Sequence, residues 1–160
     1  MNYVVGFMFD AKMNQVALIR KNKPKWQSGL LNGIGGKIEN GETSLAALMR
    51  EFWEEAGFSE ANGCKPVTWN NFCSMEGTNN DGEHFSVEFF YSIGEPEKLK
   101  TQEAEKIELV LVDDILIGKE NTIGNIPWLI ALAMDFGKGV YPPSKCNVFY
   151  GVGMDRKPAK

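Results

Sequence analysis

The chain has 160 residues, a mass of 17.9 kDa and a formal net charge of −4. This length fits a single domain, and a hydrophobic content of 43% is enough to fill one core. The composition excludes intrinsic disorder, and the acidic balance argues against a protein that holds a nucleic acid duplex through its phosphates. No apolar run approaches the roughly 18–20 residues that span a bilayer, and the first residues lack the pattern of a secretion signal. We therefore expect a cytoplasmic protein without a membrane partner.

The three cysteines are Cys64, Cys73 and Cys146. They are odd in number, widely spaced and without a Cys-x-x-Cys pair, so the sequence supports neither a disulfide framework nor a zinc site. We expect three buried or half-buried thiols.

The first half of the chain alternates short apolar runs with turns and then shows one helical pattern. Runs of β-branched and aromatic residues predict strands, and polar or Gly-rich and Pro-rich stretches predict the connections between them. In chain order, the expected elements are a strand at 3–10, a turn at 11–14, a strand at 15–19, an exposed loop at 21–28, a strand at 30–34 and a helix at 42–56. Thr43 or Ser44 can cap the start of this helix, and Gly57 lies where a left-handed C-terminal cap belongs.

The second half predicts three more strands and one more helix. The expected elements are strands at 67–75 and 84–93 joined by a turn at 79–82, a charged loop at 95–106, a strand at 107–112 and a helix at 127–136 with Pro in its first turn. His84 is placed in or beside a strand. Strands that alternate with helices predict one α/β domain, with a mixed sheet and helices on its faces.

Three glutamates near the end of the first predicted helix share one face. At about 100° per residue, Glu51, Glu54 and Glu55 fall within roughly 100° of one another. A separate apolar arc is expected to pack on the sheet; it consists of Leu45, Leu48, Met49, Phe52 and Ala56. Like charges this close, near the negative end of the helix dipole, destabilise the helix. A divalent cation would compensate, and carboxylates suit Mg²⁺ or Mn²⁺; a solvated acidic face is the alternative.

Residues that flank the acidic face favour a site. Arg50 is one turn from Glu54 and reaches Glu42 if the preceding loop folds back, so it can hold carboxylates in fixed positions. Gly35 and Gly36, just ahead of the helix, let the backbone approach a ligand closely.

Together these residues resemble the complete signature of the Nudix hydrolases. The seven identical positions are Gly36, Glu42, Arg50, Glu51, Glu54, Glu55 and Gly57. With residue frequencies of roughly 5–10%, seven such identities arise by chance about once in 10⁸ starting points. Phe52 stands where Leu or Val is commoner. The resemblance implies an α/β fold, the Nudix-type α/β/α sandwich with a mixed β-sheet, as a single domain over residues 1–160.

The resemblance also implies a mechanism and a set of site residues. The family cleaves nucleoside diphosphate derivatives through metal-activated water. Its pattern implies Mg²⁺, with Mn²⁺ as a substitute, on Glu51, Glu54, Glu55 and the carbonyl oxygen of Gly36. One glutamate, most often that at the Glu51 position, also serves as base. Arg50 and Glu42 orient the ligands rather than bind the metal.

Further residues are candidates outside the signature. Many relatives add a metal-binding acid from a later loop; Glu105 is the first choice here and Glu103 the reserve, with solvated carboxylates as the alternative. The residues expected to contact phosphate are Lys37, Arg20 and Lys21. A solvated side chain is the alternative for Lys37.

The run from Asn32 to Lys37 resembles that of the MutT-type and oxidised purine nucleoside triphosphatases. This implies that Asn32 reads a base, unless it only shapes a turn, and Asn125 stands where those enzymes carry base-reading acids. Trp26 and Trp128 are candidates for stacking, with a core role favoured for Trp128. The markers of ADP-ribose and diadenosine polyphosphate hydrolases are absent.

We therefore predict Mg²⁺-dependent hydrolysis of (deoxy)nucleoside triphosphates, with purine or oxidised nucleotides as candidates, to a nucleoside monophosphate and pyrophosphate. The expected partner is a small nucleotide. The alternatives are hydrolysis of ADP-ribose, a nucleotide sugar or a dinucleoside polyphosphate, and a non-catalytic module that senses a nucleotide.

Overall fold

The protein is described by a computed structural model that covers residues 1–79, 81–140 and 145–149. Its strands are β1 (Asn2–Phe9), β2 (Gln15–Arg20), β3 (Leu31–Asn32), β4 (Asn70–Thr78), β5 (His84–Ile93), β6 (Lys106–Leu111) and β7 (Cys146–Phe149). Its helices are α1 (Ser44–Ala56), α2 (Val112–Leu116) and α3 (Ile126–Gly137), with short 3-10 turns at Lys25–Gln27, Glu60–Asn62 and Pro96–Lys98. No helix in these described ranges has the length and apolar character needed to cross a membrane.

The described strands form one mixed sheet in the order β3-β2-β1-β5-β4-β7, with β6 paired to β2. β1 runs parallel to β5, and β4 runs parallel to β7, whereas the other pairs are antiparallel. The predicted mixed sheet is therefore confirmed.

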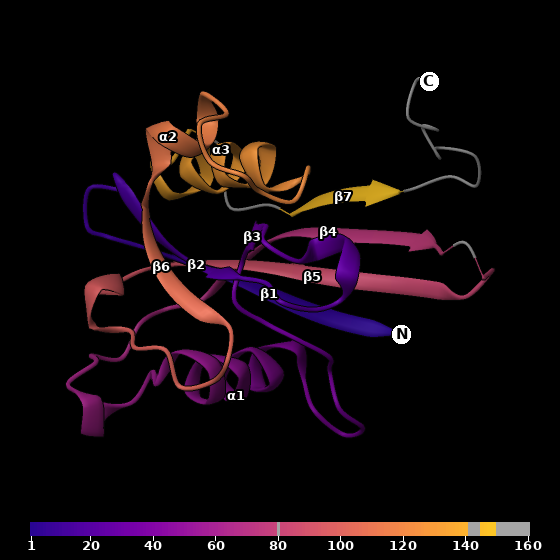
Figure 1. The fold of residues 1–160 in the computed structure, drawn as a ribbon, viewed down its shortest axis with the longest axis horizontal. Helices are drawn as coiled ribbons and strands as arrows, with labels where there is room; N and C mark the ends of the chain where they lie inside the picture. The colour runs from indigo at the N-terminus through magenta and orange to yellow at the C-terminus, as the bar shows by residue number, and fades with distance from the viewer. Residues whose placement is uncertain (80, 141–144, 150–160) are drawn as a thin grey trace.

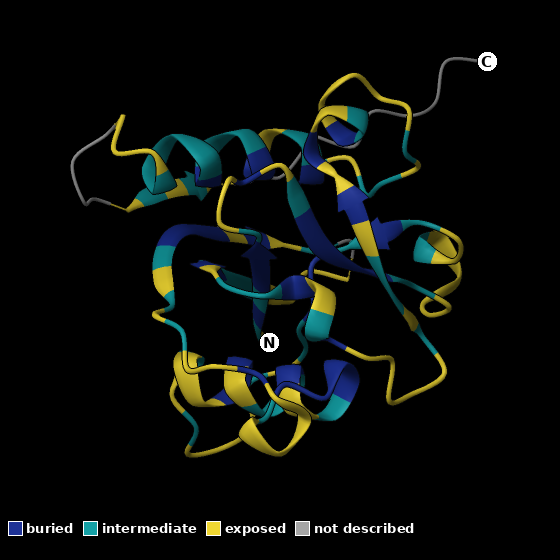
Figure 2. Cartoon of the chain, turned by 90° about the vertical axis from the view of Figure 1, so that its left-hand side faces the viewer, coloured by how far each residue is buried: buried dark blue, intermediate teal, exposed yellow. Residues whose placement is uncertain are grey.

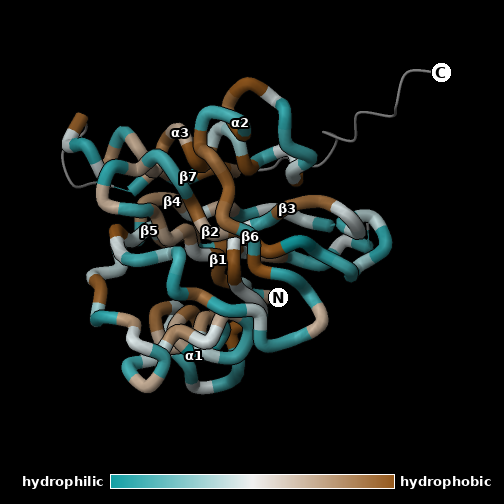
Figure 3. The backbone as a smooth tube through the Cα atoms, turned by 60° about the vertical axis from the view of Figure 1, so that its left-hand side comes forward, coloured by the Kyte–Doolittle hydropathy of each residue, from teal (hydrophilic) through white to brown (hydrophobic). Residues whose placement is uncertain are grey.

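Helices cover both faces of this sheet (Figure 1). Helix α1 lies on one face, and α2 and α3 lie on the other. A core forms on each side: Leu48 and Phe52 of α1 pack with Val4 and Met8 of β1, while the α3 side is filled around Phe7. In Figure 3 the apolar colour runs along strands of the middle layer, among them β1 and β6, and appears again around α2 and α3. This three-layer arrangement confirms the predicted α/β/α sandwich.

The rotation of α1 about its axis differs from the prediction. Leu45 and Met49 were expected in the core, but they are 45% and 39% exposed. The stripe that faces the sheet runs instead through Ala47, Leu48, Phe52, Glu55 and Ala56, and the outer side of the helix is largely exposed in Figure 2. The helix approaches β1 at Gly6, where any Cβ would collide with Leu48 and Phe52. This close approach fixes the rotation and turns Glu55 inward.

Most predicted elements are present within a few residues of their expected bounds. The strand expected at 67–75 begins only at Asn70, and α2 and β7 were not predicted. The turn at 79–82 includes residue 80, which lies outside the described residues, as do 141–144 and 150–160 of the expected single domain. Cys64 and Cys73 are buried and Cys146 is half-buried, as expected.

Candidate active site

Local signals at both ends fix the position of α1. The helix begins at Ser44, because the Thr43 hydroxyl accepts a hydrogen bond of 3.1 Å from the Ala46 N–H. It ends at Gly57, which takes the left-handed conformation with φ of 62°. These caps set where the helix begins and ends, and its close approach to Gly6 sets which way its carboxylates point.

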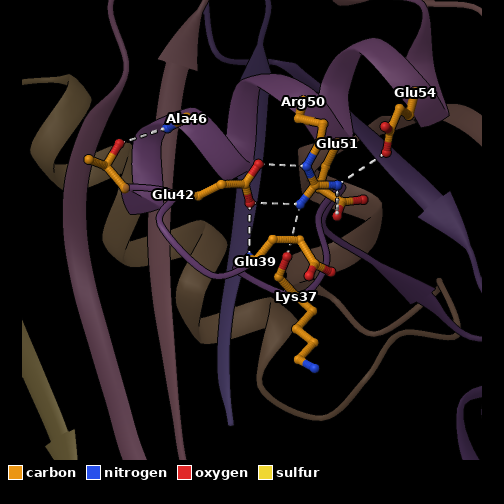
Figure 4. Close-up of polar contacts among 8 residues, drawn as sticks. Lys37, Glu39, Glu42, Ala46, Arg50, Glu51 and Glu54 are labelled. Carbon is orange, nitrogen blue, oxygen red and sulfur yellow. Dashed lines mark hydrogen bonds and ion pairs between the residues drawn. The ribbon is translucent and has the colours of Figure 1, made fainter.

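The guanidinium of Arg50 connects three carboxylates (Figure 4). Its Nε and Nη2 atoms donate to the two oxygens of Glu42 at 2.8 and 3.1 Å. Its Nη1 atom donates to Glu51 at 2.7 Å and to Glu54 at 3.1 Å, and Nη2 also donates to the Lys37 carbonyl at 2.9 Å. The same contacts raise the pKa of Arg50. A single cation thus holds the loop before the helix against the acidic face.

Glu42 is fixed from a second side. Its carboxylate also accepts a hydrogen bond of 2.9 Å from the Glu39 N–H. The hydrogen bonds from Arg50 and then from Glu39 lower the pKa of Glu42, so this carboxyl stays ionised.

Two of the three helix carboxylates, Glu55 and Glu51, lie against the Gly35-Gly36 backbone. The side chain of Glu55 is 9% exposed, and its Oε2 accepts a hydrogen bond of 3.3 Å from the Gly35 N–H. Burial raises the pKa of Glu55 to about 7. Burial also raises the pKa of Glu51, against the opposing hydrogen bond from Arg50. A Cβ at position 36 would collide with the Glu51 carboxylate, so a larger residue there requires that carboxylate to move.

The same two glycines line a cavity of about 590 Å³. The cavity is walled by the start of β1, the loop after β2, β5, part of β4 and the segment before α3. Its lining includes Tyr3, Lys21, Lys23, Trp26, Asn32, Gly35, Gly36, Met75, Phe85, Val87, Phe89, Ile123 and Asn125. An apolar chamber of this size with a few polar groups is typical of a small-molecule site.

Two amides face this chamber. Asn32 uses its Oδ1 to accept a hydrogen bond of 2.8 Å from the Gly33 N–H, which leaves its Nδ2 group as a donor. Asn125 buries its Oδ1, and that oxygen has no hydrogen-bond partner among the described residues. A buried, unpaired carbonyl is costly unless a ligand satisfies it. Trp26, at the cavity rim, is 67% exposed, and Trp128 outside it is 38% exposed.

The three basic residues predicted to contact phosphate, Lys21, Arg20 and Lys37, differ in where they lie relative to the cavity. Lys21 lines the cavity and pairs with Glu105. Arg20 is held by Glu108 at 2.6 and 2.7 Å and by the Gly29 carbonyl at 2.9 Å, and it is not among the described residues that line the cavity. Lys37 contributes its carbonyl to Arg50, while its side chain points away from the guanidinium in Figure 4.

The two acidic residues expected from the later loop, Glu105 and Glu103, lie in different surroundings. Glu105 accepts hydrogen bonds from Lys21 and from the N–H groups of Asn22 and Lys23, the latter two at 2.5 and 3.1 Å. Burial alone would raise the pKa of Glu105, but these hydrogen bonds outweigh it and lower the pKa. Glu103 is exposed and borders a smaller hollow of about 310 Å³ next to Glu54.

Comparison with known proteins identifies the family. A model of the NUDIX domain matches residues 2–129. The chain belongs to the Nudix family. The prediction of a Nudix pyrophosphohydrolase is thereby confirmed, and Nudix enzymes generally use divalent metal ions. No curated protein sequence matches the chain.

Solved structures share the Nudix fold. MutT from Bacillus halodurans is 22% identical, with 94% of this chain and 90% of that chain covered and a TM-score of 0.59. A MutT structure from work on Aliivibrio salmonicida and Vibrio cholerae is 19% identical, with 84% and 98% covered and a TM-score of 0.61. The Nudix domain of Shewanella oneidensis NrtR, complexed with ADP-ribose, is 15% identical, with 85% and 87% covered and a TM-score of 0.69.

The Nudix signature residues fit a hard divalent cation by their chemistry. Glu51, Glu54 and Glu55 supply carboxylate oxygens. Gly36 supplies a carbonyl that accepts a hydrogen bond from Val4 N–H at 2.9 Å, and among the described residues this bond leaves it a further lone pair. In the described ranges, His, Cys, Asp and Glu side chains do not form a ready-made group of three ligands. Arg50 donates to one oxygen of Glu51 and to one oxygen of Glu54.

Several cavity residues were missed from the sequence. Lys23 and Tyr3 line the cavity, as do Phe85, Val87 and Phe89 on one face of β5. The alternation of residues along 84–93 indicated that these three share a face, but not that the face borders a ligand site.

Proposed function

We propose that this protein hydrolyses (deoxy)nucleoside triphosphates to a nucleoside monophosphate and pyrophosphate, with Mg²⁺ as cofactor and Mn²⁺ as a substitute. The observation that supports this proposal most is that Gly35 and Gly36 contact both the helix carboxylates and the cavity. On one side these residues contact Glu55 and Glu51, and on the other they line the cavity. Acidic ligands and a nucleotide-sized chamber therefore share one wall.

The metal ligands in this proposal are Glu51, Glu54, Glu55 and the carbonyl of Gly36. Bound divalent cations neutralise the polyphosphate and lower the pKa of the attacking water. Arg50 holds one oxygen of Glu51 and one oxygen of Glu54, and the second oxygen of each carboxylate would be available to a cation. Glu42 keeps Arg50 in place and so limits how far they move.

The remaining steps fall to residues of the chain. Glu51 accepts a proton from the water that attacks phosphorus, and the bond from that phosphorus to the bridging oxygen breaks as pyrophosphate leaves. Lys23, on the cavity wall, offsets the negative charge of the phosphates, and Lys21 does so when it turns from Glu105. The chain carries a net charge of −4, so these cations matter for binding an anionic substrate.

The amides of the cavity support recognition of a purine base. Asn32 offers an N–H donor and Asn125 offers a buried acceptor, and a purine edge presents both an acceptor and a donor. The indole of Trp26, largely exposed at the rim, offers a stacking surface. This arrangement suits ordinary or oxidised purine nucleotides.

A panel of substrates tests the proposal. The protein is incubated with Mg²⁺ and each of the common and oxidised nucleoside triphosphates, ADP-ribose, a nucleotide sugar and a dinucleoside polyphosphate, and products are separated by chromatography. We expect a monophosphate and pyrophosphate, fastest with a purine triphosphate. Release of a nucleoside diphosphate and phosphate would contradict the assigned bond.

The panel also tests the alternatives. NrtR was solved with ADP-ribose, so faster cleavage of ADP-ribose than of any triphosphate would transfer the assignment to that class. Binding without turnover would indicate a sensing module. The Glu54→Gln variant, purified in parallel, shows whether an observed activity belongs to this site.

A further inference from the structure

Two cysteines meet outside the active site. Strand β7 runs parallel to β4, and Cys146 is the register partner of Cys73. Partners in parallel strands point to the same face of the sheet, and neighbouring strands lie about 4.8 Å apart. A disulfide needs a Cα separation of roughly 4.4–6.8 Å, so strand pairing alone provides the spacing.

The two thiols already interact. Burial and then the nearby Cys146 thiol raise the pKa of the Cys73 thiol, which donates to the Ser74 carbonyl at 3.8 Å. Cys73 is fully buried in the core on the α3 side, whereas Cys146 is half-buried at the edge of the same core. One sulfur is therefore more open to solvent than the other.

Polar contacts on either side hold the register. The Ser74 hydroxyl donates to Asn147 Oδ1 at 2.7 Å. Lys145 donates to Glu88 Oε2 at 2.6 Å, and Asn71 donates to the same oxygen at 2.5 Å. These bonds join β7 to β4 and β5 in the alignment that keeps the cysteines opposed.

We propose that Cys73 and Cys146 are a modification site that forms a reversible disulfide and ties β7 to β4. The oxidant is a small-molecule disulfide of the glutathione type. The Cys146 thiolate attacks one sulfur of that disulfide, which forms a mixed disulfide and releases one thiol. Cys73 then loses its proton and attacks the Cys146 sulfur, which releases the second thiol.

The surroundings of the two thiols agree with a reaction in which Cys146 attacks first and Cys73 second. Burial raises the pKa of Cys73 to about 12, which keeps this thiol protonated and makes it the second reactant. Oxidation therefore begins at Cys146, and the second step is the slow one.

The bond would affect the active-site cavity through β4. This strand supplies Met75 to the cavity wall, and Met75 is the register partner of Val148 in β7. The cross-link closes a loop of nearly half the chain, and constraints on long loops restrict the unfolded state most. The oxidised protein should melt several degrees above the reduced one.

The Cys64→Ser variant isolates the pair, because it leaves only Cys73 and Cys146. The full chain is equilibrated in mixtures of reduced and oxidised glutathione, quenched with an alkylating agent and weighed by intact mass spectrometry. We expect a monomeric species lighter by two hydrogen atoms and closed to alkylation, with a higher melting temperature that falls on adding dithiothreitol.

Two controls complete the test. Cys146→Ser should lose the lighter species and the rise in melting temperature, and the wild type should behave as Cys64→Ser does. A stable glutathione adduct on Cys146 without closure, or a dimer linked through Cys146, would overturn the proposal. So would a melting temperature that is equal in the two redox states.

Discussion

Glu42 and Arg50 form a two-point contact across eight positions of the chain, with hydrogen bonds of 2.8 and 3.1 Å between the carboxylate and the guanidinium. Paired hydrogen bonds of this kind fix the plane of the guanidinium as well as its position. Because the same guanidinium holds Glu51 and Glu54, Glu42 acts on the acidic face through Arg50.

We predict that Glu42→Gln lowers kcat by about 10–100-fold, the usual effect of removing a residue that orients metal ligands. The KM for nucleotide should change less, because Glu42 is not on the cavity wall. Steady-state kinetics at saturating Mg²⁺ measures both constants. Glu39→Gln, in the same loop, is the matched control and should retain activity. An unchanged kcat in Glu42→Gln would show that Arg50 needs no second anchor.

Gly36 gives a second prediction. A methyl group at this position would collide with the Glu51 carboxylate, so Gly36→Ala must displace either the proposed carbonyl ligand or Glu51. We expect the Mg²⁺ concentration for half-maximal activity to rise at least about tenfold, the lower end of the effect of disturbing metal ligands. Gly124→Ala adds the same methyl group in open space and is the control. Equal Mg²⁺ dependence in both variants would remove Gly36 from the metal site.

The later acids give a third prediction. Both oxygens of Glu105 take hydrogen bonds from residues 21–23, whereas Glu103 stands beside Glu54 at an open hollow. We therefore expect Glu103→Gln to raise the Mg²⁺ requirement. Glu105→Gln should chiefly lower the melting temperature, because it loosens the loop after β2. Mg²⁺ titration of activity and thermal unfolding separate the two effects. The reverse pattern would restore Glu105 as the added metal ligand.

Some of these features followed from the sequence because their causes are local. Thr43 sets the start of α1 and Gly57 sets its end, through hydrogen bonds and a backbone conformation that involve only near neighbours. The spacing of Arg50, Glu51 and Glu54 on one helix places their side chains together whatever the rest of the chain does. The signature residues could therefore be grouped before the structure was known.

Other features depend on contacts between distant segments. The rotation of α1 is set by its approach to Gly6, and this is why Glu55 is buried and Leu45 exposed. Strand β7 is four residues long and is stabilised by pairing with β4, far away in the chain. Without that pairing, nothing in the sequence relates Cys146 to Cys73. The cavity likewise gathers residues from six segments.

The ion pair of Arg20 and Glu108 gives a prediction of pH dependence. The hydrogen bond from Arg20 lowers the pKa of Glu108 below the ordinary value of a glutamate, and the pair joins β2 to β6. A carboxyl whose pKa is lower in the folded state than in the unfolded state stabilises the protein at every pH above its pKa in the unfolded state. This stabilisation is lost as the pH falls through the pKa of the folded state. At pH 7, Glu108→Gln should lower the melting temperature by about 1–3 °C, since half-exposed pairs contribute little. The difference should shrink below about pH 4.

Thermal unfolding of the wild type and Glu108→Gln between pH 7 and pH 3 measures this difference. Glu97→Gln, an exposed carboxylate in the turn before β6, is the control and should give the same melting temperature as the wild type at each pH. The kinetics of Glu108→Gln address the expected phosphate contact, because the variant releases Arg20 from its partner. If Arg20 binds phosphate, KM should fall in this variant, whereas an unchanged KM would leave Arg20 with the structural role that its contacts with Glu108 and Gly29 describe. A melting difference that persisted undiminished at pH 3 would show that Glu108 stabilises the sheet by packing rather than by charge.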